Sequence, residues 1–195
     1  MYGKKAMQTR ATKVTLERVA RRLFAERGFA EVSAEELVAR AGLTRGALYH
    51  HYDGKEGLFE TVVERVMQDV HAKLAADAAA QPDPLQGLHQ GIHAFLKICT
   101  QPSVQRILLI DAPAVLGWPK WREMDARYGL GLLRSALSSA MKAGLLRTQD
   151  ADVLAHLLLG ALTEAAMMIA RSKSPAKSRK AAEHALASML SGWRV

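Results

Sequence analysis

Apolar residues recur along most of the chain with the period of an α-helix. Residues 16–24 show this most clearly, because the apolar ones take positions i, i+3, i+4, i+7 and i+8 of one stripe: Leu16, Val19, Ala20, Leu23 and Phe24. Gly28 ends this helix, and Phe29 is placed to fold back onto its last turn. The sequence has no alternating pattern long enough for a strand. It therefore predicts an all-α protein with about nine helices.

Short helices with capping residues follow the first one. Ser33 opens a helix that Gly42 ends, Thr44 caps the next, and Asp53 is positioned as a further cap. Two short helices joined by a tight, glycine-containing turn over residues 33–52 have the layout of a helix-turn-helix. In this arrangement the second helix is free to enter the major groove of DNA.

Longer helices are predicted for the rest of the chain. They cover residues 56–80, 85–99, 103–111, 121–143, 151–170 and 179–190. Residues 112–119 are interrupted by two prolines and Gly117, so we expect a loop there. The helix lengths divide the chain into an N-terminal domain over residues 1–55 and a larger helical domain over residues 56–195.

Charge separates the same two regions. The chain carries a formal net charge of +8, with 27 Lys and Arg against 19 Asp and Glu. Residues 1–55 hold eleven of the basic and six of the acidic side chains, which leaves the longer region with a net charge of only +3. A basic excess on the short helices favours a polyanionic partner.

Composition excludes several classes of protein. Hydrophobic residues make up 49% of the chain and charged residues 24%, values typical of a soluble globular protein. The single cysteine, Cys99, excludes an internal disulfide and a cysteine-rich zinc module, and its place on an apolar stripe predicts an inert buried thiol. No secretion signal is visible, and polar residues interrupt the apolar stretch 151–168. We expect a cytoplasmic protein without a membrane partner.

The second helix of the helix-turn-helix carries side chains suited to DNA. Its outward positions are Arg45, Gly46, Ala47, Tyr49, His50 and His51. Arginine can bind guanine O6 and N7 through two hydrogen bonds, and small residues let the helix backbone approach the groove closely. Tyrosine and histidine can hydrogen-bond phosphate oxygens.

These motifs resemble those of a known family. Phe-Ala-Glu-Arg-Gly-Phe at residues 24–29 and Ala-Gly-Leu-Thr-Arg-Gly-Ala-Leu-Tyr-His-His-Tyr-Asp-Gly-Lys-Glu-Gly-Leu at residues 41–58 are similar to the DNA-binding domain of TetR-family transcriptional regulators. The resemblance covers about residues 12–62. Tyr52 departs from it, because phenylalanine is commonest at that position, and Asp53-Gly54 replaces a more usual polar pair.

The resemblance implies a role for each matching position. Ser33 and Thr44 would cap helices and contact phosphate, while Arg45, Gly46 and Ala47 would face the bases. Tyr49 and His51 would contact the DNA backbone. Lys55 would add its charge to a helix N-terminus directed at phosphate.

The longer domain would bind a small molecule and form a dimer. In this family the remaining helices enclose a ligand pocket, for which the aromatic and aliphatic candidates are Phe95, Ile107, Leu116, Trp118, Trp121 and Tyr128. The last two helices would form the dimer interface, and they carry more apolar residues than one inner face uses. Its candidate residues are Leu154, Leu158, Leu162, Ala165, Leu186 and Met189.

The predicted function is therefore that of a ligand-responsive repressor. It would bind a palindromic operator as a homodimer, need no cofactor, and be released by a small molecule of unknown identity. The alternative is an all-helical enzyme or small-molecule carrier without DNA binding, although the sequence shows no catalytic set or phosphate loop. Activation in place of repression also stays open. His89 and His93 have a spacing that can hold zinc on one helix, but no third ligand is evident nearby.

Overall fold

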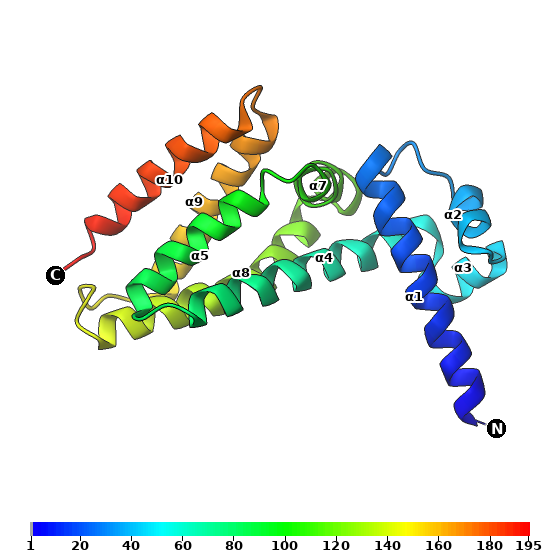
Figure 1. Cartoon of the computed structure of the whole chain (residues 1–195), viewed down its shortest axis with the longest axis horizontal. Coiled ribbons are helices and arrows are strands. Elements are labelled where there is room, and N and C mark those ends of the chain that lie inside the picture. The colour runs from blue at the N-terminus through cyan, green and yellow to red at the C-terminus, as the bar shows by residue number, and fades with distance from the viewer. Residues whose placement is uncertain (1) are drawn as a thin grey trace.

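The computed structural model describes residues 2–195, except for the side chains of residues 2–6 and 8. Within that range the prediction of an all-α fold is confirmed, since the chain forms ten α-helices and one π-helical segment (Figure 1). Their bounds are α1 (Tyr2–Arg27), α2 (Ala34–Ala41), α3 (Arg45–Tyr52), α4 (Gly54–Ala79), α5 (Pro84–Ile98), α6 (Pro102–Val104), η1 (Gln105–Asp111), α7 (Ala112–Leu116), α8 (Trp118–Lys142), α9 (Ala151–Arg171) and α10 (Pro175–Ser191).

Helices α1, α2 and α3 form one end of the molecule, and α4 runs from them into the other end (Figure 1). The core of the first end is aromatic. Phe59, on the second turn of α4, packs against Phe24 and Phe29 with ring centres 5.1 Å and 5.0 Å apart. α4 therefore supplies part of this core, so the packing of the first end continues past residue 55, where helix length places the predicted boundary.

Caps hold the short helices at the predicted residues. Ser33 Oγ accepts from the Glu36 amide at 3.0 Å, and Thr44 Oγ1 accepts from the Ala47 amide at 3.3 Å. Gly42 ends α2 with a positive φ of 66°, a conformation that favours glycine. The prediction that Asp53 caps the next helix is wrong, because its φ is 55° and its side chain makes no capping bond. The sharp turn from α3 into α4 requires a left-handed backbone at Asp53, and the Asp53 side chain takes no part in capping α4.

Two contacts fix the recognition helix α3 against its neighbours. A Cβ atom on Gly57 would lie 1.5 Å from the carbonyl oxygen of Tyr52, so only glycine permits the close approach of α3 and α4. The Tyr52 hydroxyl donates to the carboxylate of Glu17 on α1 at 2.8 Å. Burial and this bond to Glu17 raise the pKa of Tyr52 well above its usual value. Tyrosine thus adds a link to α1 that phenylalanine could not make.

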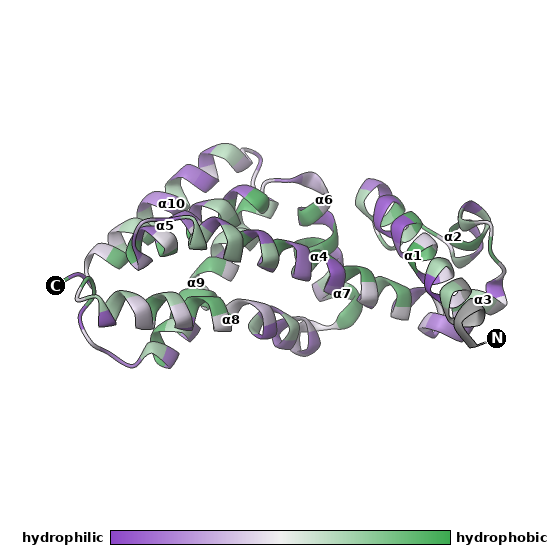
Figure 2. Cartoon of the chain, turned by 60° about the horizontal axis from the view of Figure 1, so that its bottom comes forward, coloured by the Kyte–Doolittle hydropathy of each residue, from purple (hydrophilic) through white to green (hydrophobic). Residues whose placement is uncertain are grey.

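The other end of the molecule consists of α5, α8, α9, α10 and the C-terminal part of α4, which packs against α5 and α8. In Figure 2 hydrophobic and hydrophilic residues alternate along each helix, as expected for amphipathic helices. Of the described helices, α9 alone is long and apolar enough to span a membrane by composition. It packs against α5, α8 and α10, as expected for the core helix of a helical bundle.

The stretch between α5 and α8 differs from the prediction of one helix followed by a loop. It forms α6, η1 and α7, and residues 112–116 are helical because proline is tolerated in the first turn of a helix. Pro113 has no N–H to bond the carbonyl oxygen of Leu108, five residues earlier. The buried indole of Trp121 donates to that oxygen instead, at 2.8 Å. The Trp121 side chain thus satisfies a buried carbonyl oxygen that Pro113 leaves without a backbone donor.

The segment after α1 links the two ends. The amide of Phe29 donates to Asp111 Oδ2, at the end of η1, at 2.7 Å. On the other side of the same residue, Lys55 Nζ donates to the Phe29 carbonyl oxygen at 3.1 Å and lies 3.9 Å from the ring centre. A movement of η1 would therefore be transmitted through Phe29 to the helix-turn-helix.

Candidate DNA-binding surface and effector cavity

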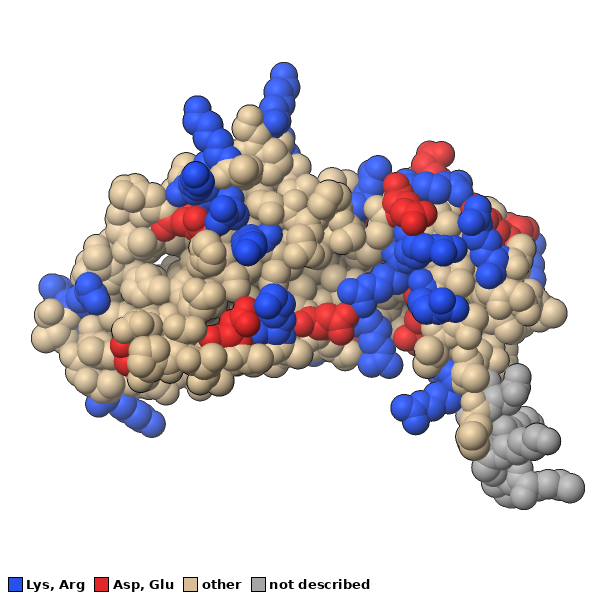
Figure 3. Space-filling view, in the orientation of Figure 1, with Lys and Arg blue, Asp and Glu red and all other residues tan. Residues whose placement is uncertain are grey.

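The predicted DNA-contacting residues lie together on one exposed surface formed by the helix-turn-helix. Ser33 caps the exposed start of α2. Arg45, Gly46, Tyr49 and His50 of α3 are also exposed. On the opposite side of the helix pair, Leu37 and Leu48 are fully buried and join α2 to α3. Lysine and arginine side chains gather over the same end of the molecule, at the right of Figure 3. The surface thus combines positive charge with an exposed helix that the core holds in place.

Arg45 is held in position at the start of α3. Its guanidinium pairs with Glu35 at 2.9 Å and lies 5.6 Å from the ring centre of Tyr49. A hydrogen bond with Tyr49 and the charge of Glu35 raise the pKa of Arg45. Both partners are exposed, so the guanidinium can exchange Glu35 for an acceptor on DNA at little cost.

A hollow runs between α1 and α3. Thr9 and Thr12 line it on the α1 side, and the α3 side includes Thr44, His50 and His51. Desolvation, followed by the charges of His50 and Lys13, lowers the pKa of His51. A neutral imidazole keeps one N–H donor for a phosphate oxygen. Gly46 and Ala47 form part of the same wall, where larger side chains would fill the hollow.

Lys55 is the exception among the predicted contacts. Its ammonium group is engaged by the carbonyl oxygen and the ring of Phe29, and the side chain is partly buried. Its observed role is to anchor the segment after α1. A phosphate contact from Lys55 would have to compete with this anchor.

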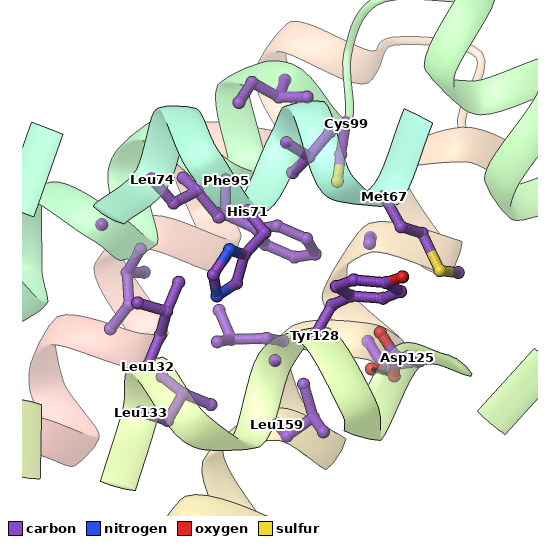
Figure 4. A pocket seen from close by; sticks show the side chains of 18 of the residues that line it. Met67, His71, Leu74, Phe95, Cys99, Asp125, Tyr128, Leu132, Leu133 and Leu159 are labelled. Carbon is purple, nitrogen blue, oxygen red and sulfur yellow. Dashed lines mark hydrogen bonds between the residues drawn. The ribbon is translucent and has the colours of Figure 1, made fainter. Parts of the chain in front are cut away.

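A cavity of about 150 Å³ lies between α4, α5, α8 and α9 (Figure 4). Most of its wall is aliphatic, with leucines from all four helices. His71 from α4, Phe95 from α5 and Tyr128 from α8 bring aromatic rings to it. Figure 4 shows His71 and Tyr128 pointing into the space from opposite helices, and their ring centres are 6.2 Å apart.

Half of the predicted pocket residues reach this cavity. Phe95, Trp121 and Tyr128 line it, whereas Ile107, Leu116 and Trp118 do not. Ile107 and Leu116 pack instead in the core that joins the two ends of the molecule, and Trp118 is exposed at the start of α8. The π-helical turns of η1 turn Leu108 and Leu109 toward the cavity in place of Ile107.

Polar groups at one side of the cavity were missed by the sequence analysis. Asp125 Oδ2 accepts from the hydroxyl of Thr163 at 2.9 Å and from Arg122 at 2.5 Å. Burial raises the pKa of Asp125, although Thr163 and Arg122 act in the opposite direction. The sequence does contain a signal, because Asp125 is the carboxylate on the inner stripe of α8 with Trp121 and Tyr128.

Cys99 also lines the cavity. The prediction of an inert thiol is supported, since burial raises its pKa to about 12. His89 and His93 do not converge, because their Nδ1 atoms contact the Leu85 carbonyl oxygen and Glu183 respectively.

The predicted dimer residues lie mostly inside the chain. Leu154, Leu158, Leu162, Ala165 and Leu186 belong to the core of the larger domain, and Met189 is exposed. Helix α9 is apolar on more than one face, and periodicity alone does not show which of them turns inward. Its exposed apolar residues are Val153, Leu157 and Met168. Together with Met189 they define an outer apolar face on α9 and α10.

Comparison with known proteins shows which family has this arrangement. Residues 18–62 match the family described as "Bacterial regulatory proteins, tetR family", and residues 85–193 match the "Tetracyclin repressor-like, C-terminal domain". The chain belongs to the TetR family of transcriptional regulators. Both predicted parts, the DNA-binding domain and the helical effector domain, are confirmed by these matches.

Solved structures and a curated relative agree. A TetR-family transcriptional regulator from Pectobacterium atrosepticum is 34% identical, with 97% of each chain covered and a TM-score of 0.88. SmeT, in complex with triclosan, is 25% identical, with 95% of this chain and 92% of SmeT covered and a TM-score of 0.72. The TetC protein of transposon Tn10 from Escherichia coli is 26% identical over 77% of this chain and 76% of TetC.

These findings confirm the predicted class of function. The protein is a ligand-responsive, DNA-binding transcriptional regulator and not an enzyme. The exposed face of α3 and the cavity between α4, α5, α8 and α9 are the candidate sites for its two kinds of partner.

Proposed function

We propose that the protein represses transcription by binding a palindromic operator as a homodimer, and that a small molecule in the cavity releases it. The observation that carries this proposal is the combination of an exposed recognition helix at one end of α4 with a hollow apolar core at the other. On the operator, Arg45 of each subunit would contact a guanine in the major groove. Ser33, Thr44, Tyr49 and His51 would contact phosphate and position the helix. The protein would act in the cytoplasm.

The outer apolar face on α9 and α10 is the proposed dimer interface. Leu157 is 62% exposed and Met168 is 46% exposed, so a second subunit would bury apolar surface that is now in contact with water. Ala181, Ala185 and Met189 follow one another along the exposed side of α10 at intervals of four residues. A two-fold axis through this face would place two recognition helices on one operator.

The proposed release mechanism passes through η1. Leu108 and Leu109 of η1 line the cavity, and Asp111 at its end holds the amide of Phe29. A ligand that fits better when η1 has moved would therefore favour a different position of the helix-turn-helix. It can shift the equilibrium only by its difference in affinity for the two states.

A fluorescence anisotropy titration tests the proposal. The full-length protein is titrated onto a labelled duplex containing an inverted repeat from the region upstream of its own gene, and onto a scrambled duplex. We expect tighter binding to the first duplex, with one dimer bound per repeat. Equal binding to both duplexes at several salt concentrations would contradict operator recognition.

A second titration addresses release. A small molecule that weakens operator binding should itself be bound more weakly in the presence of operator, by the same factor, because the two equilibria are linked. If a molecule occupies the cavity and leaves operator binding unchanged, the proposed release mechanism is wrong.

A further inference from the structure

The size of the cavity limits what it can hold. A partly open space of about 150 Å³ is of the order that accepts a benzene-sized molecule. The rings of His71, Phe95 and Tyr128 at its wall offer faces and edges to a second aromatic ring.

The polar side of the cavity provides one acceptor. Asp125 lines the cavity, and the hydrogen bonds that it accepts from Thr163 and Arg122 both end on Oδ2. Its other oxygen, Oδ1, accepts no hydrogen bond from the described residues. The Tyr128 hydroxyl is already used, since it donates to Glu64 at 2.9 Å and accepts from Gln68 at 3.2 Å. Asp125 Oδ1 and the ring nitrogens of His71 are therefore open to a donor on the ligand, and Asp125 Oδ1 is the only one of them on a carboxylate.

The charges around Asp125 favour a neutral donor. Arg122 lies 2.5 Å from Oδ2 and balances the carboxylate, so a cationic ligand would add an unbalanced charge to an apolar site. Among the described residues that line the cavity there is no lysine or arginine to bind a carboxylate or phosphate. The low polarity that raises the pKa of Asp125 would likewise disfavour any further ion.

We propose that the ligand is an uncharged, single-ring aromatic molecule with a hydroxyl group, and that this hydroxyl donates to Asp125 Oδ1 while the ring packs among His71, Phe95 and Tyr128. Asp125 is then the residue that determines ligand specificity. This inference rests on the proposed effector role of the cavity, and it adds the chemical class of the effector.

The test compares four molecules of similar size on the purified full-length protein without DNA. Isothermal titration calorimetry measures the affinity for phenol, toluene, benzoate and benzylamine. Phenol should bind about tenfold or more tightly than toluene, because a hydrogen bond to a charged acceptor adds to the shared burial of the ring. Benzoate and benzylamine should both bind more weakly than phenol.

Two matched variants on α8 assign the preference to Asp125. Asp125→Asn should lower the phenol-to-toluene ratio severalfold and leave toluene affinity within about twofold of the wild type, because a neutral acceptor makes a weaker bond. Glu123→Gln removes the same charge from an exposed position two residues away and should keep the wild-type ratio. Thermal unfolding without ligand checks that both variants are folded.

Several outcomes would overturn the proposal. Equal affinities for phenol and toluene, or no saturable binding of either up to its solubility in water, would remove the hydroxyl contact. Tightest binding of benzylamine would show that the site selects a cation. Tightest binding of benzoate would show that a cationic group outside the cavity wall reaches it.

The design separates this proposal from the proposed function. If phenol is preferred through Asp125 but operator binding is unaffected by any cavity ligand, the ligand class stands and the regulatory role fails. If operator is released by a molecule without a hydroxyl, the regulatory role stands and the ligand class fails.

Discussion

Three phenylalanine rings fill the core at the DNA-binding end of the molecule, whereas the helices at the effector end surround a cavity of about 150 Å³. A ligand that binds this cavity only in the folded state would stabilise the larger domain. The filled core holds α3 in one position for DNA. The hollow core leaves the larger domain free to respond to what occupies it.

The exposed surfaces of the two ends also differ. The DNA-binding end presents charged and polar side chains, and the effector end presents leucine and methionine on α9 and α10. A polar and charged surface suits DNA, whose binding is reversible and depends on the salt concentration and on the bound ligand. An apolar surface of helix side chains suits a lasting contact with a second subunit.

The largest effect is expected from Leu157→Glu on the outer apolar face. Burying one leucine contributes about 1.5–3 kcal/mol, and each dimer contains two copies, so the variant should be monomeric at micromolar concentration. Static light scattering measures the mass. Gln149→Glu adds the same charge in the exposed segment between α8 and α9 and should remain dimeric.

Leu158→Glu separates the inner from the outer face of α9. Leu158 is only 1% exposed, so a charge there should unfold the larger domain and not merely divide the dimer. Circular dichroism during thermal unfolding shows the difference. A folded, monomeric Leu158→Glu protein would mean that Leu158 belongs to the dimer interface after all.

Truncating an aromatic ring at each end should distinguish the filled core from the hollow one. Phe59→Ala should cost about 3–5 kcal/mol, because the ring is fully buried between Phe24 and Phe29. Phe95→Ala should cost less, since its ring is partly exposed and already borders empty space. Urea unfolding measures both free energies. Equal losses would show that the cavity wall is as tightly packed as the aromatic core.

Removing Arg45 should affect DNA binding and leave stability unchanged. Arg45→Ala should weaken operator binding by about 1–3 kcal/mol per half-site and relax the preference at one base position. Anisotropy titrations on cognate and scrambled duplexes measure this. An equal loss on both duplexes would make Arg45 a phosphate contact.

Glu35→Gln is a control that should strengthen DNA binding, whereas Arg45→Ala should weaken it. It removes the partner that holds Arg45 at 2.9 Å in the absence of DNA, and also a negative charge beside the phosphates. Because an exposed ion pair is worth about 0.2–1 kcal/mol, we expect at most about fivefold tighter binding per half-site, on both duplexes. Weaker binding would show that Glu35 positions Arg45 for DNA.

The smallest effect concerns pH. Burial raises the folded-state pKa of Asp125 above its unfolded value, so the protonated carboxyl favours the folded protein. Its contribution to stability is present at pH below the unfolded pKa, near 4, and is lost as pH rises through the folded pKa. The stability of Asp125→Asn relative to the wild type should therefore increase from pH 4 to pH 7. Urea unfolding at both pH values measures this difference, and a decrease would mean that Arg122 dominates.

Local patterns in the sequence determine most of the DNA-binding end. Caps such as Ser33 and Thr44, the glycine at residue 42 and the stripe from Leu16 to Phe24 act over a few residues, so their outcome can be predicted without knowing the fold. The same is true of the exposed side of α3, because a helix with one buried stripe has only one other side to present.

Only the tertiary structure decided the details of the effector end. Helix α9 is apolar around most of its circumference, so packing against α5, α8 and α10, and not periodicity, selects Leu158 for the core and Leu157 for the surface. The carbonyl oxygen of Leu108 in η1 accepts from the indole of Trp121, which lies thirteen residues further along the chain. The cavity is space that four helices leave between them, and its carboxylate, Asp125, accepts a hydrogen bond from Thr163 on another helix. Contacts between residues distant in sequence produce each of these features, which is why a local pattern does not reveal them.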